Sequence, residues 1–109
     1  MDENINDWIS KKITSNDVVL FMKGTPETPQ CGFSSQVVQI LNYLGIEFSS
    51  VNVLENESIR NGIKEYTNWP TIPQLYVKNE FIGGADIVRE MFEENELKEF
   101  LKDKGIATN

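Results

Sequence analysis

Val18-Val19-Leu20-Phe21-Met22 is a continuous apolar run that precedes a loop and the segment Cys31-Gly32-Phe33-Ser34. An apolar run without alternation predicts a strand that is buried on both faces. Two prolines and a glycine in residues 23–30 exclude regular structure there. Apolar residues then recur at helical spacing from Phe33 to Leu44, and Gly45 is expected to close that helix. Cys31 therefore lies where a loop meets the start of a helix.

The rest of the chain carries similar patterns on both sides of this unit. Apolar spacing predicts helices around Ile5–Ile13, Ile59–Tyr66 and Ile87–Leu101, and the last of these has room to split in two. We expect a strand from Phe48 to Val53 and a tight hairpin in which strands at 75–77 and 81–82 flank Lys78-Asn79-Glu80. Gly83-Gly84 ends the hairpin, and Asp86 is expected to be the N-cap of the helix that follows.

The predicted element order, αβαβαββα, defines a fold class. A strand-helix-strand unit crosses over right-handed and pairs in parallel, while a hairpin adds antiparallel strands. The sequence therefore predicts an α/β fold with a mixed four-stranded sheet and helices on both faces, in one domain spanning residues 1–109. Ligands of such open sheets gather at the carboxyl ends of the parallel strands, where Lys23 and the loop to Cys31 lie.

Composition excludes several classes of function. Ten basic against seventeen acidic residues give a formal net charge of -7, which argues against a nucleic-acid surface. No segment approaches the ~20 apolar residues of a membrane span. The acidic N-terminus, Met1 to Asn4, predicts no signal peptide. We expect a reducing compartment, the cytoplasm of a bacterial type of cell, or an organelle matrix if the chain is a processed eukaryotic form.

The chain has no histidine and a single cysteine, Cys31. Cys-His catalysis and an ordinary zinc site are therefore excluded within one chain. A dithiol redox protein carries C-x-x-C, but here Ser34 occupies the second position. Because serine cannot attack a disulfide, any thiol exchange must recruit an external thiol.

The position of Cys31 favours a reactive thiol over a buried, inert one, the alternative for a lone cysteine. The unpaired N–H groups and the helix dipole at a helix N-terminus favour a thiolate and lower the pKa from about 8.5. Lys23, at the end of the preceding strand, is expected to add a positive charge nearby.

Four motifs together identify a resemblance. They are Lys23-Gly24-Thr25-Pro26, Cys31-Gly32-Phe33-Ser34, Trp69-Pro70-Thr71-Ile72-Pro73-Gln74 and Gly83-Gly84-Ala85-Asp86. In this order and spacing they resemble the CGFS monothiol glutaredoxins over nearly the whole chain. The resemblance implies a thioredoxin-like fold and a site for glutathione.

The resemblance also assigns roles to residues. It implies that Ile72-Pro73 is a cis-proline turn, which pairs the Ile72 backbone with the glutathione peptide, and that Thr71 borders the thiol. Gly84 lets the backbone approach a ligand, and the N–H groups at Ala85 and Asp86 suit the γ-glutamyl carboxylate. The cationic partners of the glycine carboxylate are then Lys23 and Arg60. Trp69 has an aromatic packing role as an alternative to ligand contact.

The number of thiols in the chain bears on how it would bind an iron-sulfur cluster. A [2Fe-2S] cluster normally takes four thiolates, and one chain offers one. Two copies of Cys31 and two glutathiones complete the set in a homodimer, the assembly that the resemblance also implies. We therefore expect a carrier that passes the cluster to apo iron-sulfur acceptors, with BolA-like proteins as possible partners. Two alternatives stay open, a glutathione-dependent oxidoreductase that acts mainly in deglutathionylation and an adaptor that works by binding partners.

Overall fold

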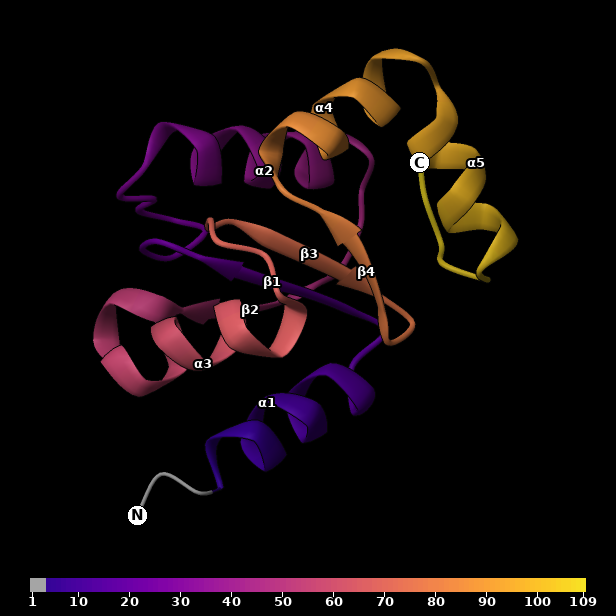
Figure 1. Cartoon of the computed structure of the whole chain (residues 1–109). Helices are drawn as coiled ribbons and strands as arrows, with labels where there is room; N and C mark the ends of the chain where they lie inside the picture. Colours follow the sequence, from indigo (N-terminus) through magenta and orange to yellow (C-terminus); the bar gives the residue numbers. More distant parts are fainter. Residues whose placement is uncertain (1–3) are drawn as a thin grey trace.

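The computed structural model describes residues 4–109 (Figure 1). The prediction that no signal peptide is present rests mostly on residues 1–3, which lie outside the described residues. The elements in chain order are α1 (Ile5–Thr14), β1 (Val18–Met22), α2 (Gly32–Tyr43), β2 (Ser49–Asn52), the 3-10 helix η1 (Val53–Glu55), α3 (Glu57–Thr67), β3 (Gln74–Val77), β4 (Glu80–Gly83), α4 (Ala85–Glu93) and α5 (Glu96–Asp103).

The strands form a mixed four-stranded sheet, as predicted, and their order in the sheet is β2-β1-β3-β4. β1 pairs in parallel with β2, whereas β3 is antiparallel to both β1 and β4. In this register Met22 lies opposite Asn52, and Phe21 lies opposite Gln74. The carboxyl ends of β1 and β2 and the start of β3 therefore lie side by side at the same end of the sheet.

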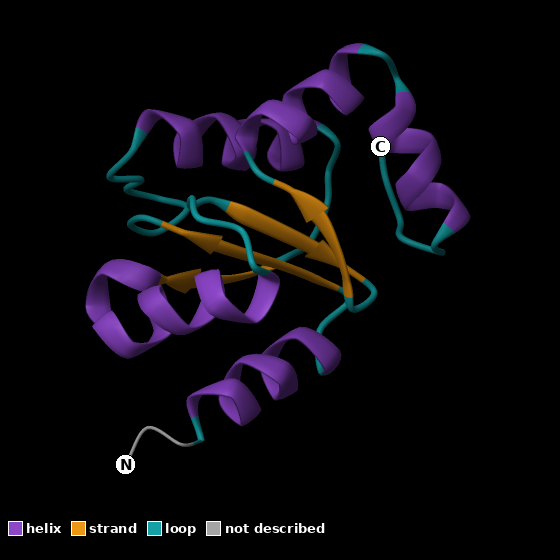
Figure 2. Ribbon diagram, in the orientation of Figure 1, coloured by secondary structure: helices purple, strands orange, loops and turns teal. Residues whose placement is uncertain are grey.

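Helices cover both faces of the sheet. Figure 2 shows α2 and α4 on one face and α1 and α3 on the other. Val18, Leu20 and Met22 pack into the core under α2 and α4, while Val19 and Phe21 pack into the core under α1 and α3. All five side chains of β1 are buried, which confirms the predicted strand that is buried on both faces. Burial of one such side chain is worth about 1.5–3 kcal/mol, so β1 anchors both layers.

The helix ends follow the sequence in one place and differ in another. Gly45 adopts a left-handed φ of 72° just after α2, which confirms that it closes the helix. The expectation that Asp86 is the N-cap of α4 is wrong, because Gly84 is the N-cap and Asp86 lies in the first turn. Its carboxylate there lies 3.6 Å from the guanidinium of Arg89, and an acidic group at this end suits the helix dipole.

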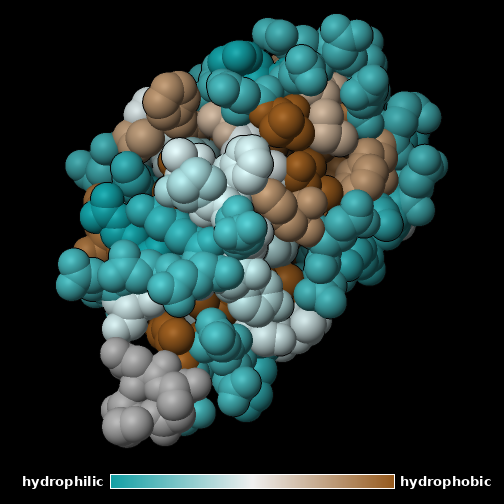
Figure 3. Space-filling model, viewed as in Figure 1, coloured by the Kyte–Doolittle hydropathy of each residue, from teal (hydrophilic) through white to brown (hydrophobic). Residues whose placement is uncertain are grey.

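The hairpin and the C-terminal helices fill in the predicted pattern. Lys78 and Asn79 both have positive φ, at 50° and 69°, and form a two-residue turn, so that β4 already begins at Glu80. The last helical stretch is split in two by Asn95, whose φ is 61°. Within residues 4–109 no helix is long and apolar enough to cross a membrane. Figure 3 shows a mostly hydrophilic face on which hydrophobic residues gather near α4.

Candidate functional site

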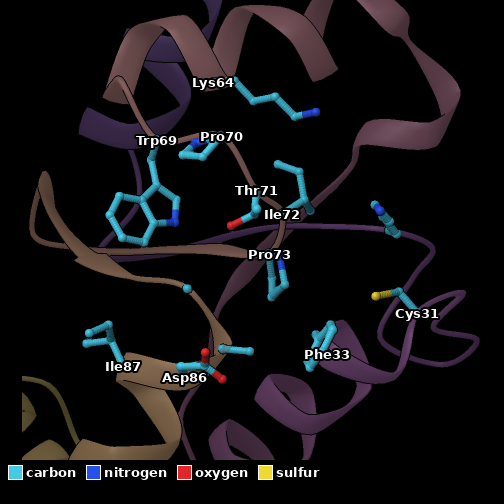
Figure 4. A pocket seen from close by; sticks show the side chains of 13 residues that line it. Cys31, Phe33, Lys64, Trp69, Pro70, Thr71, Ile72, Pro73, Asp86 and Ile87 are labelled. Atoms are coloured by element: carbon cyan, nitrogen blue, oxygen red, sulfur yellow. The ribbon is translucent and has the colours of Figure 1, made fainter.

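A pocket of about 460 Å³ opens beside the carboxyl end of β1 (Figure 4). Lys23 just after β1, the start of α2, α3, the segment before β3 and the start of α4 surround it. Its lining residues are Lys23, Cys31, Phe33, Lys64, Trp69, Pro70, Thr71, Ile72, Pro73, Gly84, Ala85, Asp86 and Ile87. Every site residue predicted from the sequence lines this pocket except Arg60. What these residues bind stays a prediction at this point.

Cys31 is the N-cap of α2, in an extended conformation with φ -153° and ψ 135°, and it is partly exposed. Partial burial opposes ionisation of its thiol. The backbone N–H groups of Ser34 and Phe33, the ammonium of Lys23 and the Ser34 hydroxyl outweigh this effect and lower the pKa of Cys31. Neither N–H forms a capping hydrogen bond with the thiol, so they act as partial positive charges near the sulfur. The site thus favours a thiolate.

Ser34 links the helix of Cys31 to the strand of Lys23. Its side chain is fully buried, and its hydroxyl accepts a 3.1 Å hydrogen bond from the backbone N–H of Lys23. The sequence shows only that serine cannot serve as a second thiol. The structure adds that its hydroxyl positions the backbone that carries the nearest lysine.

The loop between Lys23 and Cys31 has no helix or strand, as predicted, but hydrogen bonds within its own backbone hold it together. Gln30 donates its N–H to the carbonyl of Lys23 at 2.9 Å, and Thr25 and Thr28 exchange backbone hydrogen bonds at 3.2 and 3.0 Å. An ordered loop of this kind presents Cys31 in one orientation toward the pocket.

The opposite wall, residues 69–73, is held from beneath by a buried amide. Gln74 donates through Nε2 to the carbonyls of Trp69 and Thr71, at 3.1 and 3.2 Å. Its Oε1 accepts from the hydroxyl of Tyr76 at 3.2 Å, and burial raises the pKa of Tyr76, so the phenol stays a donor. The peptide bond before Pro73 is cis, as the resemblance implies. Sequence reasoning missed Gln74.

The third wall is the N-terminus of α4. A Cβ on Gly84 would lie 3.3 Å from the carbonyl oxygen of Pro73 and 3.5 Å from Nε1 of Trp69, so the two walls approach closely there. The first N–H groups of a helix lack intrahelical partners. Because the N-cap is a glycine without a side chain, these groups remain able to bind an anion.

A cation of α3 faces the pocket, but it is not the expected one. Lys64 lines the pocket, whereas Arg60, one helical turn earlier, does not. In Figure 4, Lys64 lies across the pocket from Asp86, with Cys31 along a side between them. The helical spacing of four residues from Arg60 was the signal that could have found Lys64. A role for Arg60 stays a prediction.

Aromatic and apolar side chains form the rim of the pocket. Phe33 is 58% exposed, and Ile87 and Trp69 are each 39% exposed. Trp69 also packs on Phe81, with ring centroids 5.9 Å apart, so it has both the packing role and the pocket-facing position considered above. The rim is therefore apolar around a site that is cationic on one side.

The donor set limits what the pocket can hold. Among residues 4–109, no group of three or more His, Cys, Asp and Glu side chains is placed to hold a metal ion. One cysteine with a lowered pKa, two lysines and a helix N-terminus instead suit a thiol that carries carboxylates.

Three comparisons place this geometry among known proteins. A family model described as glutaredoxin matches residues 18–82. A ycf64-like monothiol glutaredoxin of Synechocystis sp. is 57% identical over 94 residues, which cover 86% of this chain and 88% of the relative. A probable monothiol glutaredoxin 2 of Rickettsia typhi is 53% identical over 105 residues, 95% of each chain. The solution structure of a monomeric truncated mutant of Trypanosoma brucei 1-C-Grx1 superposes with a TM-score of 0.88 at 46% identity, over 95% of this chain and 94% of that one.

Proposed function

The chain belongs to the glutaredoxin family, among its monothiol members, and we propose that it binds glutathione and carries a [2Fe-2S] cluster to acceptor proteins. One observation supports this most directly. The only thiol of the chain, Cys31, is partly exposed in a pocket with two lysines, and Ser34 replaces the thiol that an internal redox cycle would need. Thiol chemistry at this site therefore requires a thiol from another molecule.

The chemistry of glutathione fits the pocket. Glutathione has a thiol, two carboxylates, an ammonium group and peptide bonds, and a pocket of about 460 Å³ is within the usual range for small ligands. Lys23 and Lys64 suit one carboxylate, the N–H groups at the start of α4 suit the other, and Asp86 suits the ammonium group. The backbone of Ile72 is the proposed partner of the glutathione peptide. The thiol of glutathione would then lie beside Cys31.

The cluster is the cargo, and its ligands must come from more than one molecule. A [2Fe-2S] cluster normally takes four thiolates. Cys31 of two copies and two glutathione thiols supply four, which is why we propose a homodimer in the loaded state. Half of the ligands are exchangeable, which suits release to apo iron-sulfur acceptors or a BolA-like partner. A reducing, cytoplasmic setting is part of the same proposal.

Anaerobic reconstitution tests the proposal. With iron, sulfide and glutathione we expect a coloured dimer, which reverts to a colourless monomer when glutathione is removed. Cys31→Ser is expected to abolish the colour, whereas Ser35→Ala, on the same helix, is expected to retain it. A colourless monomer of the wild-type chain under all of these conditions would reject the cluster, and a coloured Cys31→Ser variant would require other ligands.

The lowered pKa of the partly exposed Cys31 thiol also favours a second function, removal of glutathione from mixed disulfides. The Cys31 thiolate would attack the glutathione sulfur, displace the substrate thiolate and form a Cys31–glutathione disulfide. The thiolate of a second glutathione would then attack the glutathione sulfur of this disulfide, which releases the Cys31 thiolate and forms oxidised glutathione. We expect slow turnover because the site is proposed to hold one glutathione without activating the second, attacking one. Fast turnover with a small glutathionylated substrate would make this the main activity.

A further inference from the structure

Two consecutive backbone N–H groups just beyond β1 are bound by side chains from different elements. The N–H of Lys23 donates to Ser34 on α2 at 3.1 Å, and the N–H of Gly24 donates to Oδ1 of Asn52 at 2.9 Å. The parallel ladder pairs Met22 with Asn52 and ends there. The Asn52 side chain therefore continues the pairing between β1 and β2 by one residue beyond the last backbone pair.

The Asn52 side chain is itself held in one orientation. The same Oδ1 accepts a 3.0 Å hydrogen bond from the N–H of Leu54, so that Asn52 is also the N-cap of η1. Gly24, which it binds, has a φ of 91°. A Cβ at that position would lie 2.6 Å from both the N of Gln30 and the carbonyl oxygen of Thr28. The turn that follows Lys23 is thus fixed from the β2 side by a single amide oxygen.

The orientation of the Lys23 side chain depends on this turn. Within residues 4–109 the ion pairs are Lys78 with Asp17, Arg89 with Asp86 and Lys104 with Glu80, so no carboxylate holds the Lys23 ammonium. A lysine side chain is long and flexible. Because no ion pair fixes it, the part of the pocket that its ammonium reaches depends on where the backbone of Lys23 lies.

We propose that Asn52 is a positioning residue, which fixes the turn at Gly24 and thereby holds the Lys23 ammonium facing Cys31 and an incoming carboxylate. The identification of that carboxylate with glutathione rests on the proposed function, but the positioning itself does not. Ser34 contributes to the same backbone, but it also acts on the Cys31 thiol directly and so cannot isolate the effect.

The test compares two alkylating reagents on the apo protein without glutathione. Iodoacetate carries a carboxylate and iodoacetamide does not, and both react with the same thiolate of Cys31. We divide the rate constant of iodoacetate by that of iodoacetamide at the same pH. The thiolate fraction cancels in this ratio, which therefore measures the positive electrostatic potential at the sulfur. We expect Lys23→Gln to lower this ratio by roughly two- to five-fold, the value of an exposed charge interaction. Asn52→Ala should lower it in the same direction.

A double variant separates positioning from general damage. In the Lys23→Gln background Asn52→Ala should leave the ratio unchanged, whereas in a Lys64→Gln background it should still lower it. The matched control is Asn56→Ala, because Asn56 caps α3 through a 3.1 Å bond from the N–H of Ile59 and does not bind the loop. This control should retain the wild-type ratio.

The outcomes decide the proposal. A wild-type ratio in Asn52→Ala, or an equal fall with and without Lys23, would overturn it. If Asn52→Ala fails to fold, Asn52→Ser keeps a capping oxygen for Leu54 on a shorter side chain, and the same fall or its absence decides. Because neither glutathione nor a cluster is present, failure of the reconstitution experiment would reject the proposed function and leave this result standing.

Discussion

The backbone N–H of Lys23 donates a 3.1 Å hydrogen bond to the hydroxyl of Ser34, whose side chain is fully buried. This bond joins the end of the central strand to the first turn of the helix that Cys31 caps. It keeps the one thiol of the site and its nearest lysine in a fixed relation. The serine of the C-x-x-S segment is thus part of the framework of the pocket.

Removal of this hydroxyl should destabilise the fold. Ser34→Ala leaves the N–H of Lys23 without its acceptor in a partly buried place, which costs about 1–3 kcal/mol. Urea unfolding followed by circular dichroism measures the change. The control is Ser35→Ala, whose exposed hydrogen bond with Gln39 should contribute within about 0.5 kcal/mol. Equal midpoints for the two variants would contradict a structural role of the Ser34 hydroxyl.

The ionisation of Cys31 predicts a pH dependence. Its pKa is lowered in the folded state, because the N–H groups of α2 and the Lys23 ammonium outweigh burial. The rate of iodoacetamide alkylation should therefore rise with pH around a midpoint below that of the same cysteine in the urea-unfolded chain, about 8.5. A midpoint at or above the unfolded value would contradict this arrangement.

The same shift has a consequence for stability. A lowered folded pKa means that ionisation stabilises the folded state, and this stabilisation is fully present above the unfolded pKa. It is lost as the pH falls through the folded pKa. The difference in the free energy of unfolding between wild type and Cys31→Ser should therefore increase as the pH rises through that window. Urea unfolding at several pH values measures it, and a difference independent of pH would disprove the linkage.

Local sequence patterns predicted those parts of the site that depend on residues close together in the chain. The apolar run gave the position of β1, and the loop-to-helix junction gave the position of Cys31. The bond between Gly24 and Asn52 joins residues 28 positions apart, and no pattern near either residue indicates it. The N-cap prediction for Asp86 failed for a local reason. Gly83, the last residue of β4, has a φ of 151°, and α4 already begins at Ala85 with Gly84 as its N-cap.

Gly24 should not tolerate a side chain. Its φ of 91° is costly for any other residue, and a Cβ would lie 2.6 Å from two backbone atoms of the same loop. We expect Gly24→Ala to cost at least about 1–3 kcal/mol of stability and to weaken glutathione binding. The control is Gly32→Ala, because a Cβ on Gly32 has no neighbour within 4 Å. Thermal unfolding measures the stability of both variants, and a glutathione titration measures their affinity. Equal stability and equal affinity in the two variants would contradict the prediction.

The amide of Gln74 offers the sharpest test of how the pocket wall is held. Gln74→Glu keeps the size of the side chain but removes both donors to the carbonyls of Trp69 and Thr71. A carboxylate there is fully buried against two carbonyl oxygens, so we expect a loss of at least about 2–3 kcal/mol at neutral pH. The folded-state pKa of the introduced carboxyl group should be raised, since the protonated acid can donate to one carbonyl. The penalty should therefore shrink as the pH falls toward that pKa.

Tyr76→Phe is the matched control for this change. It removes the hydroxyl that donates to Oε1 of Gln74 and also interacts with Thr67, but it leaves Nε2 on the two carbonyls. It should cost about 1 kcal/mol, with no dependence on pH in the acid range. Urea unfolding of both variants between acid and neutral pH, with a glutathione titration at each pH, measures stability and pocket together. If Gln74→Glu matched wild type at neutral pH, the wall formed by Trp69 and Thr71 would not depend on the buried amide. If it lost stability and kept full affinity for glutathione, Gln74 would support the fold without shaping the binding site.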